Sequence, residues 1–124
     1  MEALAAAPRE KAEVLTSAAA RIANLWGFSN AKLGTVLGVS MATASRLRSG
    51  QSQLDPASKS FEAAQFLLRL FRSLDALLGS DDIAAKSWLA TPNLDLGGRP
   101  IEQIDTMRGL MAVCDYVDFY RARV

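Results

Sequence analysis

Apolar residues recur at helical spacing through most of the chain, and this pattern predicts an all-α fold. The longest amphipathic run covers residues 57–78, with Arg69, Arg72 and Ser73 on its polar side. An earlier run covers residues 8–27 and starts with a proline in its first turn, and the residues before it are expected to fray. Two further helices are predicted at residues 81–90 and 110–121.

Residues 30–50 fit two short helices with an apolar wedge between them. Gly34 lacks a side chain where these helices approach each other, and Gly38 suits the left-handed residue that ends the first helix. Ser40 then suits the N-cap of the second helix. The pattern predicts a helix-turn-helix, although a plain helical hairpin in a bundle core has the same spacing. The wedge residues stand three or four positions apart and are Leu33, Leu37, Ala44 and Leu47.

Positive charge is unopposed in this part of the chain, because no acidic residue lies between Glu13 and Asp55. The bases in that interval are Arg21, Lys32, Arg46 and Arg48. Such an excess favours the DNA backbone, and the second helix of a helix-turn-helix enters the major groove. The predicted DNA-binding residues are Met41, Ala42, Thr43, Ser45, Arg46, Arg48 and Ser49. Arg46 is the candidate for a guanine edge, and Arg48 is one of the candidates for a phosphate.

The composition argues against a catalytic role. The sequence has no histidine and one cysteine, which excludes the commonest metal sites, serine or cysteine triads and an internal disulfide. Ser80 is the predicted N-cap of the helix 81–90, and Asp81 and Asp82 fall in its first turn, where the helix dipole favours negative charge. The two aspartates are therefore interpreted as part of the helix start and not as a catalytic or metal-binding pair. We therefore expect no enzymatic activity, no cofactor and no small-molecule substrate.

A glycine pair, Gly97 and Gly98, precedes Pro100, which suits the start of a helix. Free backbone amides before a helix can cradle a phosphate. However, no predicted strand precedes the pair and no lysine follows it, so the nucleotide-loop patterns do not fit. A structural turn is the prediction, with Leu94 and Leu96 pinning the loop to the core.

The predicted helix 110–121 carries more than one apolar stripe and only a thin polar edge. It is either central to the core or bound to another protein, and both interpretations stay open. Residues 1–54 hold six basic and three acidic residues, whereas the remainder holds eight and ten. This asymmetry favours an N-terminal helix-turn-helix region, residues 1–56, and a C-terminal helical domain, residues 57–124, in which residues 57–79 form a shared helix.

The C-terminal half contains a set of short motifs with distinctive spacing. They are Trp88-Leu89, Pro92-Asn93, Leu96-Gly97-Gly98, Pro100-Ile101, Thr106, Gly109 and Val113. Together they resemble the toxin-binding domain of the Xre/MbcA/ParS antitoxin family, which also carries an Xre-like helix-turn-helix in front of that domain. The resemblance implies an antitoxin that covers the active-site cleft of an NAD-consuming RES-domain toxin, in a complex that represses its own operon. With a single cysteine and no possible internal disulfide, a cytoplasmic protein is the default expectation.

The partners implied by this resemblance are the RES-domain toxin and double-stranded operator DNA. A homodimer is expected, because a single helix-turn-helix reads only a short half-site. The candidate toxin-binding residues are Arg99, Tyr116, Phe119, Tyr120, Arg121, Arg123 and Val124. The arginines among them suit carboxylates in a cleft built for a charged dinucleotide, although a solvated surface explains them equally well. No membrane association is expected, since charges interrupt the longest apolar run.

A solitary helix-turn-helix regulator is the alternative to an antitoxin. Its C-terminal half would serve only for dimerisation, through a symmetric and self-complementary patch. The two hypotheses differ in whether a second, toxic protein binds the C-terminal half.

Overall fold

The computed structural model describes residues 2–123, with side chains for residues 8–123. Seven helices in this range confirm the all-α prediction. They are α1 (Glu2–Leu25), α2 (Asn30–Leu37), α3 (Met41–Ser49), α4 (Lys59–Leu78), α5 (Asp82–Ala90), α6 (Pro100–Gln103) and α7 (Met107–Arg121). Among the described helices, none is long and apolar enough to cross a membrane.

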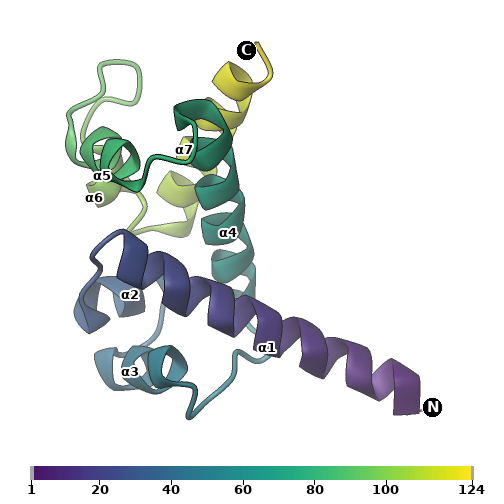
Figure 1. The fold of residues 1–124 in the computed structure, drawn as a ribbon. Coiled ribbons are helices and arrows are strands. Elements are labelled where there is room, and N and C mark those ends of the chain that lie inside the picture. Colours follow the sequence, from purple (N-terminus) through teal and green to yellow (C-terminus); the bar gives the residue numbers. More distant parts are fainter. Residues whose placement is uncertain (1, 124) are drawn as a thin grey trace.

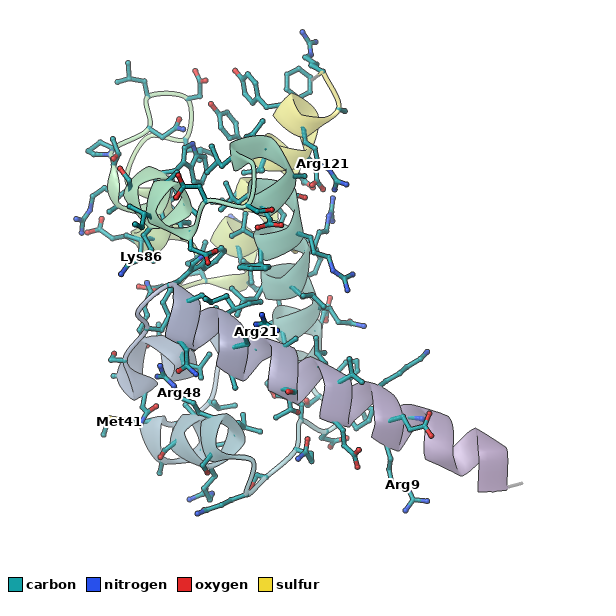
Figure 2. All side chains as sticks on the ribbon, in the orientation of Figure 1. Arg9, Arg21, Met41, Arg48, Lys86 and Arg121 are labelled. Carbon is teal, nitrogen blue, oxygen red and sulfur yellow. The ribbon has the colours of Figure 1, made fainter. Side chains whose placement is uncertain are left out.

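The helix α4 connects the two groups of helices (Figure 1). It packs against α1 and α2 in the N-terminal half and against α5 and α7 in the C-terminal half. The N-terminal part of α1, where Arg9 lies, extends away from the rest of the molecule (Figures 1 and 2). Because α4 is in contact with both halves, the helix-turn-helix and the C-terminal helices are held in one framework.

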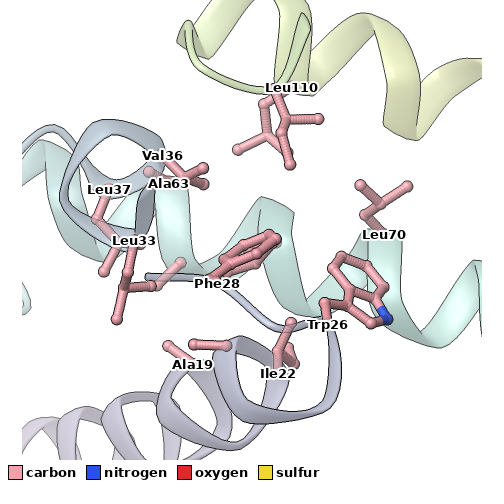
Figure 3. Close-up of a cluster of buried hydrophobic side chains, with 14 of the residues drawn as sticks. Ala19, Ile22, Trp26, Phe28, Leu33, Val36, Leu37, Ala63, Leu70 and Leu110 are labelled. Carbon is pink, nitrogen blue, oxygen red and sulfur yellow. The ribbon is translucent and has the colours of Figure 1, made fainter. Parts of the chain in front are cut away.

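A single hydrophobic core runs through both halves. Trp26 and Phe28, which both follow the end of α1, point toward Leu70 of α4 and Leu110 of α7 (Figure 3). Both leucines are fully buried. Since burying a leucine side chain contributes about 1.5 to 3 kcal/mol, the wide apolar face of α4 stabilises both packing layers.

The starts of α1 and α4 differ from their predicted positions. The helix α1 begins at Glu2 and contains Pro8 in its interior, because the alanine-rich residues before the proline favour helix. The helix α4 begins at Lys59 rather than at residue 57. Ser58 is its N-cap, and the Ser58 hydroxyl accepts a hydrogen bond from the backbone N–H of Phe61 at 3.1 Å.

Gly79 is the C-cap of α4, and the N-cap of α5 is Asp81 rather than the predicted Ser80. The Asp81 carboxylate accepts from the backbone N–H of Ala84 at 3.0 Å. Ser80 instead adopts a left-handed φ of 63°, and its hydroxyl donates to Asp75. The capping interpretation of the two adjacent aspartates therefore agrees with the structure, with the cap moved by one residue.

The last helix starts earlier than predicted. It begins at Met107, and Thr106 is the N-cap, with its hydroxyl accepting from the backbone N–H of Gly109 at 3.0 Å. Gly109 thus lies inside the first turn of α7, whereas the sequence pattern placed it before a helix starting at Leu110. The missing side chain lets the turn pass close to the backbone of Gln103.

Ser73 was expected on the polar side of α4, but the structure buries it against α7. Its hydroxyl donates to one carboxylate oxygen of Asp118, and the Arg69 Nε donates to the other at 2.7 Å. This hydrogen bond raises the pKa of Arg69. A buried hydroxyl needs such a partner. The Ser73 and Arg69 hydrogen bonds to Asp118 therefore hold α4 against α7.

Cys114 lies close to these hydrogen bonds, on the buried face of α7. Burial raises the pKa of its thiol to about 12, and the sulfur donates to the carbonyl of Phe66 at 3.2 Å. The cysteine is therefore a small core residue, as the sequence indicates.

Candidate functional site

The first candidate surface depends on the turn between α2 and α3. Gly38 ends α2 with a φ of 74°, and the backbone N–H of Val39 donates to the Gly34 carbonyl at 2.8 Å. A Cβ on Gly34 would lie only 2.7 Å from the Val39 oxygen, so the tight turn requires glycine there. Ser40 then caps α3 by accepting from the backbone N–H of Thr43 at 3.0 Å.

The helix α3 has an inner and an outer face, as predicted. Ala44 and Leu47 are buried against the other helices. Arg46 is exposed, and its guanidinium donates to the Thr43 hydroxyl at 3.2 Å. This hydrogen bond holds the Arg46 side chain on the same face of α3 as Thr43. Met41 lies at the outer edge of the molecule (Figure 2) and is 62% exposed. We call this outer face the α3 surface, and its exposed residues are Met41, Ala42, Ser45, Arg46 and Ser49, with Thr43 half-buried.

Arg48, a predicted phosphate contact, does not lie on the α3 surface. Its Nε and Nη2 donate to the Asn24 side-chain oxygen at 3.0 and 2.8 Å. Its Nη1 donates to the Phe28 carbonyl at 2.6 Å and to the Asn30 side-chain oxygen at 3.2 Å. The guanidinium therefore holds α3 against the end of α1 and the start of α2.

Lys32, a second base of the acid-free interval, is also occupied within the chain. Its ammonium group lies 2.5 Å from a carboxylate oxygen of Asp105 and donates to the carbonyl of Ile101. This contact ties α2 to the segment between α6 and α7. Among the described side chains, Arg21, Arg46 and Arg48 have no carboxylate within ion-pair distance, so Lys32 is the base of this interval whose charge is neutralised within the chain. The available positive charge is therefore smaller than the sequence count indicates.

The second candidate surface is a row of aromatic rings from α5 and α7. Trp88 stacks on Tyr116 with ring centroids 6.3 Å apart, and Tyr116 meets Tyr120 at 4.9 Å. Phe119 packs edge-on against Tyr120 at 5.5 Å. Phe119 is 52% exposed and Tyr120 is 41% exposed. We call these four residues the aromatic surface.

The loop between α5 and α6 supports the aromatic surface. The Tyr116 hydroxyl donates to the Asp95 carboxylate at 2.8 Å. Asn93 lowers and Asp95 raises the pKa of the Tyr116 phenol through their hydrogen bonds, and the net direction is upward. The loop is closed by a bridge between Asn93 and Gly98, which agrees with the predicted structural turn. Leu94, however, is 99% exposed and does not pin the loop.

The structure brings together only part of the predicted toxin-binding set. Tyr116, Phe119, Tyr120 and Arg123 form one group, because the Arg123 guanidinium lies 4.2 Å from the centre of the Phe119 ring. Arg99 pairs with Glu102 beside α6. Arg121 lines a groove next to α1, on the side toward which α1 extends (Figure 2). Val124 lies outside the described residues.

Two members of this site were missing from the predicted set. Trp88 belonged to the family motif, but the sequence did not indicate that its ring would extend the aromatic row. Asp95 had no sequence signal, because an isolated acid in a loop is usually solvated. Its contact with Tyr116, on a distant helix, appears only in the tertiary structure.

Comparisons with known families match both halves of the chain. The antitoxin Xre-like helix-turn-helix domain matches residues 5–72. The antitoxin Xre/MbcA/ParS C-terminal toxin-binding domain matches residues 73–123, so the two regions meet within α4. No curated protein matches the sequence. With a DNA-binding helix-turn-helix followed by a toxin-binding domain, this chain belongs to the Xre/MbcA/ParS antitoxin family.

Proposed function

We propose that this antitoxin neutralises an NAD-consuming RES-domain toxin by covering the toxin's active site with its aromatic surface. The observation that carries the proposal is the exposure of Phe119 and Tyr120 at the end of α7. Large aromatic side chains left open to solvent are enriched at the centres of protein interfaces, where their burial supplies much of the binding energy. In this proposal one set of apolar residues on α7 packs in the core, and the exposed aromatic residues at its end contact the toxin.

Two exposed arginines, Arg123 beside the aromatic surface and Arg99 at the start of α6, suit a cleft that binds a dinucleotide. Arg123 is stacked on Phe119, which orders its guanidinium without occupying its N–H groups. The exposed pair of Arg99 with Glu102 contributes little to stability, so Arg99 is free to exchange Glu102 for a toxin carboxylate. In this proposal Arg123 and Arg99 bind carboxylates of the toxin.

We further propose that the antitoxin, alone or with its toxin, represses its own operon through the α3 surface. Two copies would bind together, because one helix-turn-helix contacts only a short half-site and palindromic operators match two-fold symmetric proteins. Arg46 is the proposed guanine-binding residue, and Thr43 and Ser49 are proposed phosphate contacts. Met41 and Ala42 would contact thymine methyl groups.

Co-expression with the product of a neighbouring RES-domain reading frame tests the toxin proposal. We expect the neighbour to arrest growth and deplete NAD when expressed alone, and to be tolerated and co-purified when this chain is present. A neighbour that stays toxic, or that never co-purifies, would contradict the proposal. A chain that binds operator DNA but no such partner would instead be a solitary regulator with a C-terminal dimerisation domain.

Arg46→Ala tests the proposed DNA contact. We expect operator binding to weaken by about 1 to 3 kcal/mol and the preference at one base position to relax, since a bidentate contact to guanine is lost. The measurement is an electrophoretic mobility shift with the upstream region of the operon and with single-base variants of it. Arg108→Ala, which removes an exposed arginine from α7, is the matched control and should leave binding unchanged. Equal affinities for wild type and Arg46→Ala would show that Arg46 does not read the operator.

A further inference from the structure

Leu94 is the most exposed large apolar side chain among the described residues, at 99%. It lies in the loop between α5 and α6, which stands at the same end of the molecule as the C-terminal end of α7 (Figure 1). The helix α3 lies at the opposite end. A fully exposed leucine has the whole benefit of apolar burial still available to a partner, because none of it is used within its own chain.

The loop that carries Leu94 is ordered by hydrogen bonds on both sides of this residue. The Asn93 N–H donates to the Gly98 carbonyl at 2.9 Å, and the Gly98 N–H donates to the Asn93 carbonyl at 3.2 Å. The Leu96 N–H donates to the Asn93 side-chain oxygen at 3.1 Å. The Gln103 side chain in turn donates to the Leu96 carbonyl at 2.5 Å. Leu94 therefore has a fixed place before any partner binds, so little conformational entropy is lost on association.

Exposed leucines are common on protein surfaces and need no partner when they stand alone. Leu94 does not stand alone, because the next residue along the chain is bound to the aromatic surface. The Asp95 carboxylate accepts from the Tyr116 hydroxyl at 2.8 Å, and the Tyr120 hydroxyl lies 3.5 Å from the same oxygen. The loop and the end of α7, where Phe119 and Tyr120 are exposed, therefore form one continuous surface.

We propose that Leu94 is a second anchor of the toxin interface and inserts into an apolar pocket on the toxin, beside the contact of the aromatic surface. The loop belongs to residues 73–123, which match the toxin-binding domain. DNA is a poor occupant, because Asp95 places a negative charge next to Leu94 and would repel phosphates. This inference rests on the proposed function and adds to it a contact outside α7.

Leu94→Ser in the full-length chain tests the inference. Calorimetry with the purified toxin should show a dissociation constant raised about ten-fold or more, because the apolar group that fills the pocket is lost. The circular dichroism spectrum and the thermal midpoint should not change, since Leu94 is exposed in the free chain and serine suits a turn. Ile83→Ser is the matched control and should bind toxin as wild type does, because Ile83 is 82% exposed on α5 and lies outside the loop and the aromatic surface.

Cysteine labelling locates Leu94 in the complex by a measurement other than affinity. The native thiol of Cys114 is buried, and burial raises its pKa to about 12, so it should react slowly with a maleimide. The new thiol of Leu94→Cys should react quickly in the free chain, and about ten-fold or more slowly at saturating toxin. The labelling rate of Ile83→Cys should be the same with and without toxin. Mass spectrometry of the labelled antitoxin measures these rates.

Three results would overturn the inference. The first is a toxin affinity of Leu94→Ser equal to that of Ile83→Ser. The second is a labelling rate of Leu94→Cys that saturating toxin does not lower. The third is slower labelling of Leu94→Cys at high concentrations of the antitoxin alone, which would mean that a second copy of this chain covers the loop.

Comparison with a variant in which Phe119 and Tyr120 are both replaced by alanine separates this inference from the proposed function. If that double variant lost toxin binding while Leu94→Ser kept it, the proposed function would stand and the inference on Leu94 would fall. If Leu94→Ser lost toxin binding while the double variant kept it, the loop would be the toxin contact and the proposed role of the aromatic surface would fall. A wild-type chain that binds no toxin would overturn both.

Discussion

Gly109→Ala is expected to destabilise the protein by about 3 kcal/mol or more, because there is no room for a side chain at this position. A Cβ on Gly109 would lie 1.8 Å from the carbonyl oxygen of Gln103 and 2.8 Å from its carbonyl carbon. These are backbone atoms at the end of α6, so neither can move without shifting the junction of α6 and α7. The Thr106 cap of α7 would be lost together with that junction.

Thermal and urea denaturation measure this effect, and the expected fall in the thermal midpoint is about 10 °C or more. Gly98→Ala is the matched control, since the nearest atom to its added Cβ is the end of the Gln103 side chain at 3.6 Å, an ordinary contact. It should change stability by about 0.5 kcal/mol or less. If the two variants were equally stable, the close approach at Gly109 would not be a constraint on this fold.

Replacing Phe119 and Tyr120 together by alanine is expected to abolish toxin neutralisation. Each exposed aromatic at the centre of an interface contributes about 2 kcal/mol or more, so the double variant should weaken toxin binding about a thousand-fold. The readout is the affinity for purified toxin by calorimetry, together with growth under co-expression. Folding should be preserved, because both side chains are about half exposed and neither belongs to the hydrophobic core.

The DNA-binding end provides the control for this double variant. Met41→Ala removes an exposed apolar side chain of similar accessibility from α3, and it should leave toxin binding unchanged. Conversely, the double variant on α7 should bind operator DNA as wild type does. A loss of DNA binding equal to the loss of toxin binding would mean that the substitutions unfold the chain, and unchanged toxin affinity would show that the aromatic surface is not the toxin interface.

Local patterns were enough to predict much of the helix-turn-helix. The burial of Ala44 and Leu47, the left-handed Gly38 and the Ser40 cap follow from contacts within a few residues, and all of them are present in the structure. Capping and helical spacing are short-range effects, so they can be recognised in a sequence without knowledge of its tertiary fold. Boundaries such as the start of α7 were less accurate, because two residues only three positions apart, Thr106 and Gly109, can each suit a helix end.

Long-range partners account for the errors in polar residues. Arg48 was assigned to DNA because it is basic and lies on α3, but its hydrogen-bond acceptors belong to Asn24, Phe28 and Asn30. Ser73 was predicted on the polar side of its helix, yet it faces Asp118, which lies 45 residues further along the chain. The role of a polar side chain depends on the groups that lie opposite it in the fold. The spacing of residues within its own helix does not contain that information.

The sequence by itself determined the all-α fold, the helix-turn-helix and the family of this antitoxin, because helical spacing, caps and short motifs are local properties of the chain. Only the tertiary structure decided which aromatic and charged residues form each surface. The packing of α7 on α4 buries one apolar stripe and leaves Phe119 and Tyr120 exposed. The direction of α1 leaves a groove open beside Val14. The sequence could not predict this direction, because it depends on how the helices cross and not on the residues of any one helix.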